Sequence, residues 1–313
     1  MIAPSRVRAL RPAVPAAAEP RHPRTLDERE RLPDGRVVAS RTVFPVGAEC
    51  PFACVHCDLW RHTIGPRATA PGSLPRQIRE GLAGGHGIEQ VKVYNASNFF
   101  DERAVPAADD AALVEILAPF SRLVVECHPR WIGGRCFELA ERLPGRLQVA
   151  IGLETVHPTA LPRLGKAMTV ERFDRAVDAL LTRDIGVRAF VLLGAPFVPP
   201  DEGVEWAVLS VEHALRRGVE HVAILPLRGG NGAIDELRRR GELGVPTLTD
   251  LEEAFDRSLE VARAGVVTAD LWDLEDDLAC SACREARRGR LARMNLSACV
   301  ETRVACPAGC EAT

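Results

Sequence analysis

Three cysteines lie close together in the segment Cys50-Pro-Phe-Ala-Cys54-Val-His-Cys57, with the spacing C-x3-C-x2-C. The segment follows a strand-like run, 36–44, and precedes a helix-like one. Closed [4Fe–4S] clusters take four protein ligands, so three thiolates hold three irons and leave the fourth iron open. The spacing therefore predicts a loop at the end of a strand that binds a metal centre with one free coordination position.

The same thiols have two other interpretations, a zinc knuckle and cysteines that only fill a core. Zinc sites usually join a C-x2–4-C pair to a second pair. Such a second pair is available to Cys54 and Cys57 near the C-terminus. The position of the loop directly after a strand favours the iron–sulfur centre over both alternatives.

Strand-like and helix-like patterns alternate through the middle of the chain, which is typical of βα units around a parallel sheet. The expected strands are 37–44, 90–94, 123–126, 148–154, 187–193 and 221–226. Helical patterns cover 74–82, 109–120, 137–143, 170–184 and 201–217. Thr169 can cap the fourth of these helices, and Gly186 follows its end. Six units predict an α/β fold, a partial (β/α)6 barrel of TIM-like type, rather than a closed barrel of eight strands.

The region after residue 245 is expected to hold one helix and a cysteine-rich extension. Thr249 and Glu252 fit a capping box for a helix through about Ala264. The two close pairs beyond it, C-x2-C and C-x3-C, predict a second site of four thiolates, with Cys299 as the spare thiol. The predicted ligands are Cys280, Cys283, Cys306 and Cys310. Zinc and a [4Fe–4S] cluster both accept four thiolates, so the sequence does not choose between them.

Between these pairs, the segment 284–293 carries five arginines against one acid. Its two interpretations are a solvated helix face and a nucleic-acid contact. The net charge of −3 offers no general basic field for nucleic acid or an anionic membrane.

The expected organisation is a flexible N-terminal extension (1–35), a core domain (36–245) and the helix with its cysteine-rich tail (246–313). Ten cysteines without a secretory signal indicate a reducing compartment. The chain has no apolar run of eighteen residues, so we expect a soluble, cytoplasmic protein with no membrane partner.

The cysteine loop and its place after the first core strand resemble the radical S-adenosylmethionine (SAM) superfamily, over about residues 36–244. The resemblance implies that Cys50, Cys54 and Cys57 hold a [4Fe–4S] cluster whose open iron chelates the amino and carboxylate groups of SAM. An electron from the cluster then cleaves SAM to a 5′-deoxyadenosyl radical, which abstracts hydrogen from a substrate. An electron donor such as flavodoxin or ferredoxin is implied as a partner.

Four further segments carry more local similarity. The stretch Tyr94 to Asp101 departs from the common Gly-Gly-Glu and is similar to the archaeosine-synthase radical SAM subunit, while 124–130 resembles the Glu-x-x-Pro motif of elongator-like and coproporphyrinogen-dehydrogenase-like members. The segment 149–169 resembles the elongator, methylthiotransferase and NifB-like core, and 190–196 its strand beside the adenine. The SAM-binding residues that these similarities imply are His56, Asn95, Ser97, Glu126, Glu154, Lys166 and Gly194. The plainer interpretations are a polar loop at 95–98 and a solvated cation at Lys166.

Three functions fit these features. The first is tRNA base modification, from the elongator-like resemblance and the basic segment. The second is modification of a small molecule, which the acidic net charge favours. The third is a non-catalytic protein that binds an iron–sulfur cluster or zinc.

Overall fold

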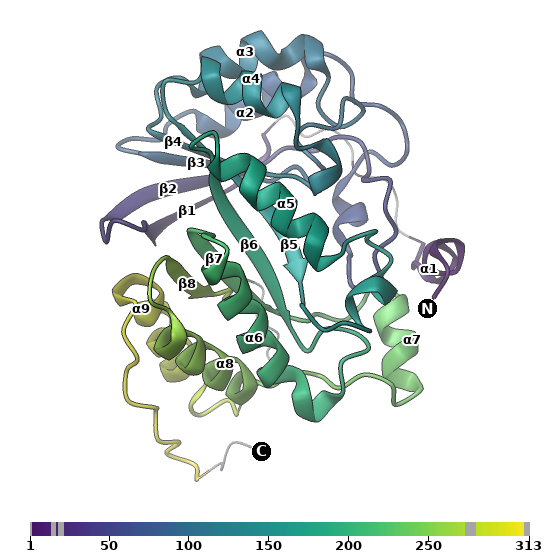
Figure 1. The fold of residues 1–313 in the computed structure, drawn as a ribbon, viewed down its shortest axis with the longest axis vertical. Helices are drawn as coiled ribbons and strands as arrows, with labels where there is room; N and C mark the ends of the chain where they lie inside the picture. The colour runs from purple at the N-terminus through teal and green to yellow at the C-terminus, as the bar shows by residue number, and fades with distance from the viewer. Residues whose placement is uncertain (1, 14–16, 18–21, 273–279, 310–313) are drawn as a thin grey trace.

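The structure of the protein is a computed structural model that describes residues 2–13, 17, 22–272 and 280–309. Its centre is one curved sheet in which eight strands follow their chain order, β2 to β8 in parallel and β1 antiparallel to β2 (Figure 1). The strands are β1 (Arg24–Arg31), β2 (Val37–Phe44), β3 (Gln90–Val93), β4 (Arg122–Glu126), β5 (Arg146–Glu154), β6 (Gly186–Leu193), β7 (His221–Pro226) and β8 (Val266–Ala269). The first and last strands do not pair, so within the described residues the barrel is partial.

Most helices cover the outer face of this sheet, whereas the first and the seventh pack against each other beside the cysteine loop (Figure 1). They are α1 (Pro4–Leu10), α2 (Ser73–Leu82), α3 (Asp110–Leu117), α4 (Gly134–Arg142), α5 (Val170–Leu181), α6 (Gly203–Arg216), α7 (Ala233–Arg239), α8 (Leu248–Val261) and α9 (Arg284–Ser297). Two 3-10 turns matter below, η3 (Pro129–Trp131) and η4 (Leu161–Leu164). The main core lies between the sheet and these helices, because alternate strand residues such as Val91, Val125 and Val187 point outward and are fully buried.

The other strand residues point into the barrel, and several of them, on β1, β3 and β6, are charged. Glu30 of β1 forms ion pairs with Lys92 of β3 at 2.8 Å and with Arg188 of β6. Burial opposes the charge on Glu30, but Arg188 and Lys92 hold the pKa of its carboxyl well below the usual range. A contact from β1 to β6 requires the sheet to curl, so these pairs contribute to the barrel shape.

The expectation of a flexible extension over 1–35 is therefore wrong for residues 24–31. These residues form strand β1, and its Glu30 is buried in the charged interior. Side chains alternate between the two faces of β1, and one of these faces lies inside the charged barrel. Because this inner face is charged rather than apolar, the hydrophilic composition of β1 hides the strand pattern in the sequence.

The six expected strands are all present, with ends shifted by two residues or fewer. The expected helix after the core exists as α8, but its N-cap is Thr247, which forms a capping box with Asp250 rather than Thr249 with Glu252. Strand β8 extends the sheet past residue 245, the expected end of the core. Among the described residues, no helix is long and apolar enough to cross a membrane.

Candidate functional site

The carboxyl ends of the parallel strands meet at one edge of the sheet, and ligands of such folds bind there. The loop with Cys50, Cys54 and Cys57, called the loop thiols below, follows β2. Asn95 and Ser97 follow β3, Glu126 and Glu154 end β4 and β5, and Gly194 follows β6. Topology alone therefore brings all these predicted residues to one edge.

The cysteine loop is held from three sides. The Asn98 Nδ2 donates to the Cys50 Sγ at 3.2 Å, and the Asn231 Nδ2 donates to the Val55 carbonyl at 2.8 Å. The Val55 amide donates to the Leu164 carbonyl in η4 at 2.9 Å. Gly165, which follows η4, has a left-handed φ of +74°, and a Cβ there would lie 3.0 Å from the Ala53 carbonyl.

The loop thiols themselves are partly exposed. Burial raises the pKa of all three, well above the usual value for Cys54 and to about 12 for Cys57. Nearby thiols and acids act in the same direction at Cys54. A site of this kind favours thiolates once a cation is bound, because the metal charge offsets the cost of deprotonation.

Glu154, Lys166 and His56 form a charged group beside this loop. The Lys166 Nζ forms an ion pair with the Glu154 Oε1, and the His56 Nε2 lies 3.5 Å from the same oxygen. Burial opposes ionisation of Glu154, but Lys166 and His56 lower the pKa of its carboxyl to about 2. Burial also acts against the charge of Lys166, yet Glu154 raises the pKa of its amine above the usual value. The interpretation of Lys166 as a solvated loop cation is therefore wrong.

The position of Glu154 depends on an irregular strand end. The register between β5 and β6 shifts between Gly152 and Glu154, and Glu154 has a left-handed φ of 68°. Such a φ is costly for a residue with a side chain and clusters at functional sites. A Cβ on Gly152 would lie 2.1 Å from both the Glu154 Oε1 and the Lys166 Nζ, so only glycine leaves room for this pair.

Several buried polar atoms near the loop find no hydrogen-bond partner among the described residues. They are both side-chain polar atoms of Asn95, the Ser97 hydroxyl and the His56 Nδ1. An unsatisfied buried polar group costs about 1–3 kcal/mol. Asn95 and Ser97 follow β3 at the carboxyl edge and His56 lies in the cysteine loop, so these atoms are placed to bind a polar ligand. This argues against the interpretation of 95–98 as a plain polar loop.

Glu126 contrasts with Glu154. Burial raises the pKa of the Glu126 carboxyl to about 8, and the Lys166 ammonium lowers it by a smaller amount. The two carboxyl groups at this edge therefore differ in charge at neutral pH, with Glu154 ionised and Glu126 mostly protonated. Sites that divide acidic and basic roles between two carboxyl groups show this difference.

Gly194 has a left-handed φ of +73°, and a Cβ there would lie 3.2 Å from the Pro246 Cδ. Both the turn and the packing of Pro246 require glycine at this position. The absence of a side chain at Gly194 therefore has a structural cause that does not depend on a ligand.

An aromatic layer lies next to the interior charges, on the side of the carboxyl ends of the strands. Tyr94 and Phe190 lie two residues after the charged Lys92 and Arg188. Tyr94 packs against Phe44, Phe190 and Trp272 with ring centroids 6.1–6.5 Å apart, mostly edge to face. Trp272 follows β8, and the Arg228 Nη2 donates to Asp270 at 2.7 Å and to the Trp272 carbonyl. Trp272 was not expected from the sequence. The alternation of inward-facing residues along β2, β3 and β6 could have indicated the other three aromatic residues, Phe44, Tyr94 and Phe190.

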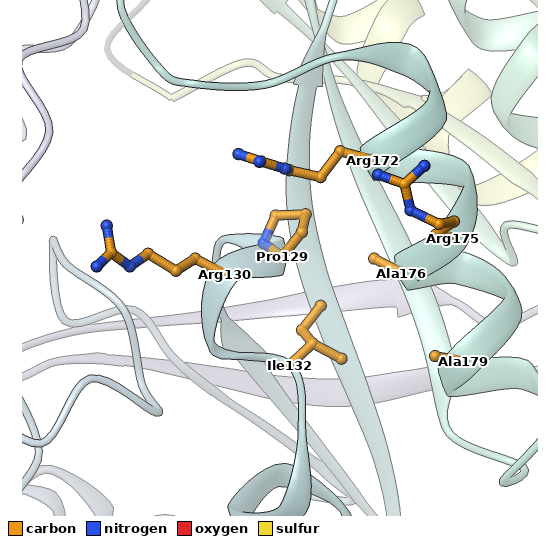
Figure 2. Close-up of a pocket in the computed structure, with 7 residues that line it drawn as sticks. All are labelled: Pro129, Arg130, Ile132, Arg172, Arg175, Ala176 and Ala179. Carbon is orange, nitrogen blue, oxygen red and sulfur yellow. The ribbon is translucent and has the colours of Figure 1, made fainter.

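A cavity of about 430 Å³ lies outside the barrel, between η3 and α5 (Figure 2). Arg130, Arg172 and Arg175 make its lining basic, and none of the predicted site residues lines it. In Figure 2, Arg130 on η3 and Arg172 on α5 extend toward the same side of the cavity. We therefore place the candidate site at the strand ends rather than in this outer cavity.

The tail cysteines form a separate group. Cys280, Cys283 and Cys306, called the tail thiols below, have sulfur atoms that all lie within 4.8 Å of one another. Cys310, the fourth predicted ligand, lies outside the described residues. Cys299 is exposed, and its Sγ lies near the Ser297 carbonyl. The described tail cysteines group with one another and not with the loop thiols. They therefore do not supply the second pair that a zinc knuckle at Cys54 and Cys57 would need.

The basic segment 284–293 is neither fully solvated nor free for nucleic acid. Arg287 and Arg290 are buried and pair with Glu252 and Asp256 of α8 at 2.6 and 2.7 Å. Both sequence-based interpretations of the segment are therefore wrong for these two residues. They connect α9 to α8 instead.

The sequence and the fold can be compared with those of known proteins. No family model matches the chain. An uncharacterised protein of Methanocaldococcus jannaschii is 22% identical over 151 residues, which are 47% of this chain and 41% of that protein. The match therefore spans less than half of that relative.

Two solved structures match more of the chain. Methylornithine synthase has a TM-score of 0.54 and 14% identity, with 85% of this chain and 73% of the synthase covered. The Elp3 protein of Methanocaldococcus infernus has a TM-score of 0.54 and 14% identity, with 80% of this chain and 63% of Elp3 covered. These likenesses show that the chain shares the partial-barrel fold of both proteins. The fold that the cysteine loop implied is confirmed.

Proposed function

We propose that the protein is a radical SAM enzyme in which Cys50, Cys54 and Cys57 hold a [4Fe–4S] cluster. The observation that carries this proposal is the place of three partly exposed thiols at the carboxyl edge of this particular fold. When bound, the cluster with SAM on its open iron supplies reductive cleavage of SAM to a 5′-deoxyadenosyl radical. The donor set fits, since three thiolates leave one iron for SAM.

The chain's own residues bind and orient SAM. The unpaired polar atoms of Asn95 and Ser97 lie beside the loop and support a role in holding the polar end of SAM. Glu154 can accept hydrogen bonds from an ammonium or from ribose hydroxyls, with its charge maintained by Lys166. His56 lies against the same carboxylate and orients it.

The layer of Phe44, Tyr94, Phe190 and Trp272 gives the site a dry floor. A carbon radical reacts with whatever hydrogen donor is near, so exclusion of other groups directs it to the substrate. We propose that the substrate lies above this layer and that Glu126, mostly protonated at neutral pH, can donate a hydrogen bond to it.

We propose a small-molecule substrate rather than RNA. The basic segment that favoured RNA has two of its arginines buried in ion pairs, which removes part of the case for tRNA. An electron donor such as flavodoxin or ferredoxin and a reducing, cytoplasmic setting complete the proposal, because free thiols and a low-potential cluster require both.

The test is SAM cleavage by reconstituted protein under anaerobic conditions with a strong reductant. We expect 5′-deoxyadenosine from the wild type and only background from Cys54→Ala. Cys299→Ala is the matched control, since Cys299 is exposed and outside both thiol groups. Full cleavage by Cys54→Ala would refute the cluster assignment. A wild type that binds the cluster but releases no 5′-deoxyadenosine would indicate the non-catalytic alternative.

A further inference from the structure

The tail thiols converge from two sides of α9. Cys280 and Cys283 lie in the turn that precedes the helix, where the Cys283 amide donates to the Cys280 carbonyl at 3.2 Å. After α9 the chain reverses at Ala298, which has a left-handed φ of 55°, and returns to bring Cys306 beside the turn. The Cys306 Sγ lies 3.9 Å from the Cys280 Sγ. Cys283 is only 1% exposed, so the group is partly enclosed by protein.

These distances fit thiolates bound to one ion. Zinc–thiolate bonds of about 2.3 Å in a tetrahedral site place the sulfur atoms about 3.8 Å apart. The observed 3.9 Å agrees with this separation. In a [4Fe–4S] cluster each thiolate binds a different iron, so the sulfur atoms stand farther apart. Among the described residues, the tail thiols are the one set of three or more potential ligands within 4.8 Å of one another, and the loop thiols are not such a set.

A disulfide does not account for the group. A disulfide needs a sulfur–sulfur distance of about 2.05 Å, whereas the Cys306 and Cys280 sulfur atoms lie 3.9 Å apart. Three thiols packed together also exceed what one disulfide would use. Three sulfur atoms at single-ion distances supply three of the four ligands of a tetrahedral thiolate site and leave one position for a further ligand.

We propose that Cys280, Cys283 and Cys306 bind one Zn²⁺ ion, which closes the tail around α9. Leu291 and Met294 anchor α9 in the main core, and Arg290 pairs with Asp256. The ion adds folding free energy at the two ends of the helix, where the turn at Cys280 and the returning segment meet. Arg303 also pairs with Asp256, at 3.1 Å, so the returning segment contacts α8 on its way to Cys306.

The zinc site connects to the barrel interior through α9. Asn295 accepts from the Ala269 amide at 2.8 Å and donates to the Ala269 carbonyl at 2.9 Å. Arg288 donates to the Leu271 carbonyl at 3.1 Å. The helix that the zinc site closes thus holds the segment that carries Trp272 into the aromatic layer.

The experiment counts metals in a triple variant with Cys50, Cys54 and Cys57 replaced by alanine, purified without added metal. We expect about one zinc per chain and no acid-labile sulfide. Replacement of that zinc by Co²⁺ should give the absorption of tetrahedral cobalt thiolate. Because the first cluster is absent from this variant, the result does not depend on the proposed SAM chemistry.

Two further substitutions in the triple variant test the ligands. Cys306→Ser should lose the zinc, and Cys299→Ser, which changes an exposed thiol outside the group, should keep it. Retention of several irons with sulfide would overturn the zinc site in favour of a cluster. Absence of bound metal from the folded triple variant, or undiminished zinc in Cys306→Ser, would also overturn it.

Discussion

The two thiol groups have similar spacings in the sequence and different surroundings in the fold. Around the loop thiols, buried polar atoms of Asn95, Ser97 and His56 have no partner among the described residues. Around the tail thiols, Arg287 and Arg290 form ion pairs with the acids of α8. The Arg290 Nη1 and the Glu252 Oε1 form no hydrogen bond, but they face each other as an ion pair at 3.7 Å. A strand edge with unpaired buried polar groups suits a ligand that binds and dissociates, whereas a site surrounded by ion pairs suits a permanently bound structural ion.

The sulfur distances lead to the same contrast. The tail thiols lie at the separation of ligands on a single ion, whereas the loop thiols are more widely spaced. The comparison teaches that cysteine spacing identifies metal sites, while the fold around the thiols distinguishes a reaction site from a structural one. The following predictions test that distinction, from the largest effect to the smallest.

The largest effect separates the two groups directly. Cys57→Ala should reduce 5′-deoxyadenosine formation to background, because two thiolates hold the cluster poorly. Cys306→Ala should keep a comparable rate per bound cluster while the melting temperature falls, since the lost ion stabilises the fold. The measurements are product release by mass spectrometry and thermal unfolding. Equal loss of cleavage in both variants at equal cluster content would break the comparison.

The next prediction tests the ion pairs around the tail thiols. Arg290 is fully buried, and Arg290→Ala leaves Asp256 with only its half-exposed partner Arg303. The expected cost is about 3 kcal/mol in unfolding free energy, the lower end of the range for a broken buried pair. Arg293, on the same helix, forms an exposed pair with Glu301, and its alanine variant should lose about 1 kcal/mol or less. Denaturant unfolding measures both. Similar losses in the two variants would contradict the packing described for α9.

How far the sequence could predict this molecule depended on how local the evidence was. Inward and outward alternation within single strands predicted β2 to β7 closely, because each strand carries its own pattern. Strand β1 was missed, since its charged face makes sense only with Arg188 and Lys92, which are distant in the chain. Strand β8 (Val266–Ala269) lies past residue 245, where only a helix and a cysteine-rich extension were expected, and it joins the sheet through its pairing with β7.

The same limit applies to the site. The three loop cysteines are local and were predicted as a unit. The ion pair between Glu154 and Lys166 depends on the bulge near Gly152, which no periodicity reveals. The partners of Arg287 and Arg290 lie in another helix, so composition suggested a solvated face where the fold has buried ion pairs.

A moderate effect is expected at Glu154. Its carboxylate stays charged beside Lys166, and loss of one charge-assisted hydrogen bond to SAM costs about 1.5–3 kcal/mol. Glu154→Gln should therefore weaken SAM binding by about ten- to a hundredfold. Glu126→Gln should change SAM affinity much less near pH 7, because that carboxyl is mostly neutral already. Calorimetric titration of the reconstituted protein with SAM measures both affinities, and an unchanged affinity in Glu154→Gln would remove that carboxylate from the SAM site.

The smallest effect concerns how stability depends on pH at the same edge. Burial raises the pKa of the Glu126 carboxyl from its usual range to about 8, so between these values the native state keeps a proton that the unfolded state has lost. Stability must then fall as the pH rises through this window. Replacement by glutamine removes the titration, so the fall between pH 5 and pH 8 should be smaller in Glu126→Gln than in the wild type. Glu141→Gln, on the exposed surface of α4, should keep the wild-type slope. Urea unfolding at both pH values provides the comparison, and a wild-type slope in Glu126→Gln would show that the neutral acid is not a feature of this edge.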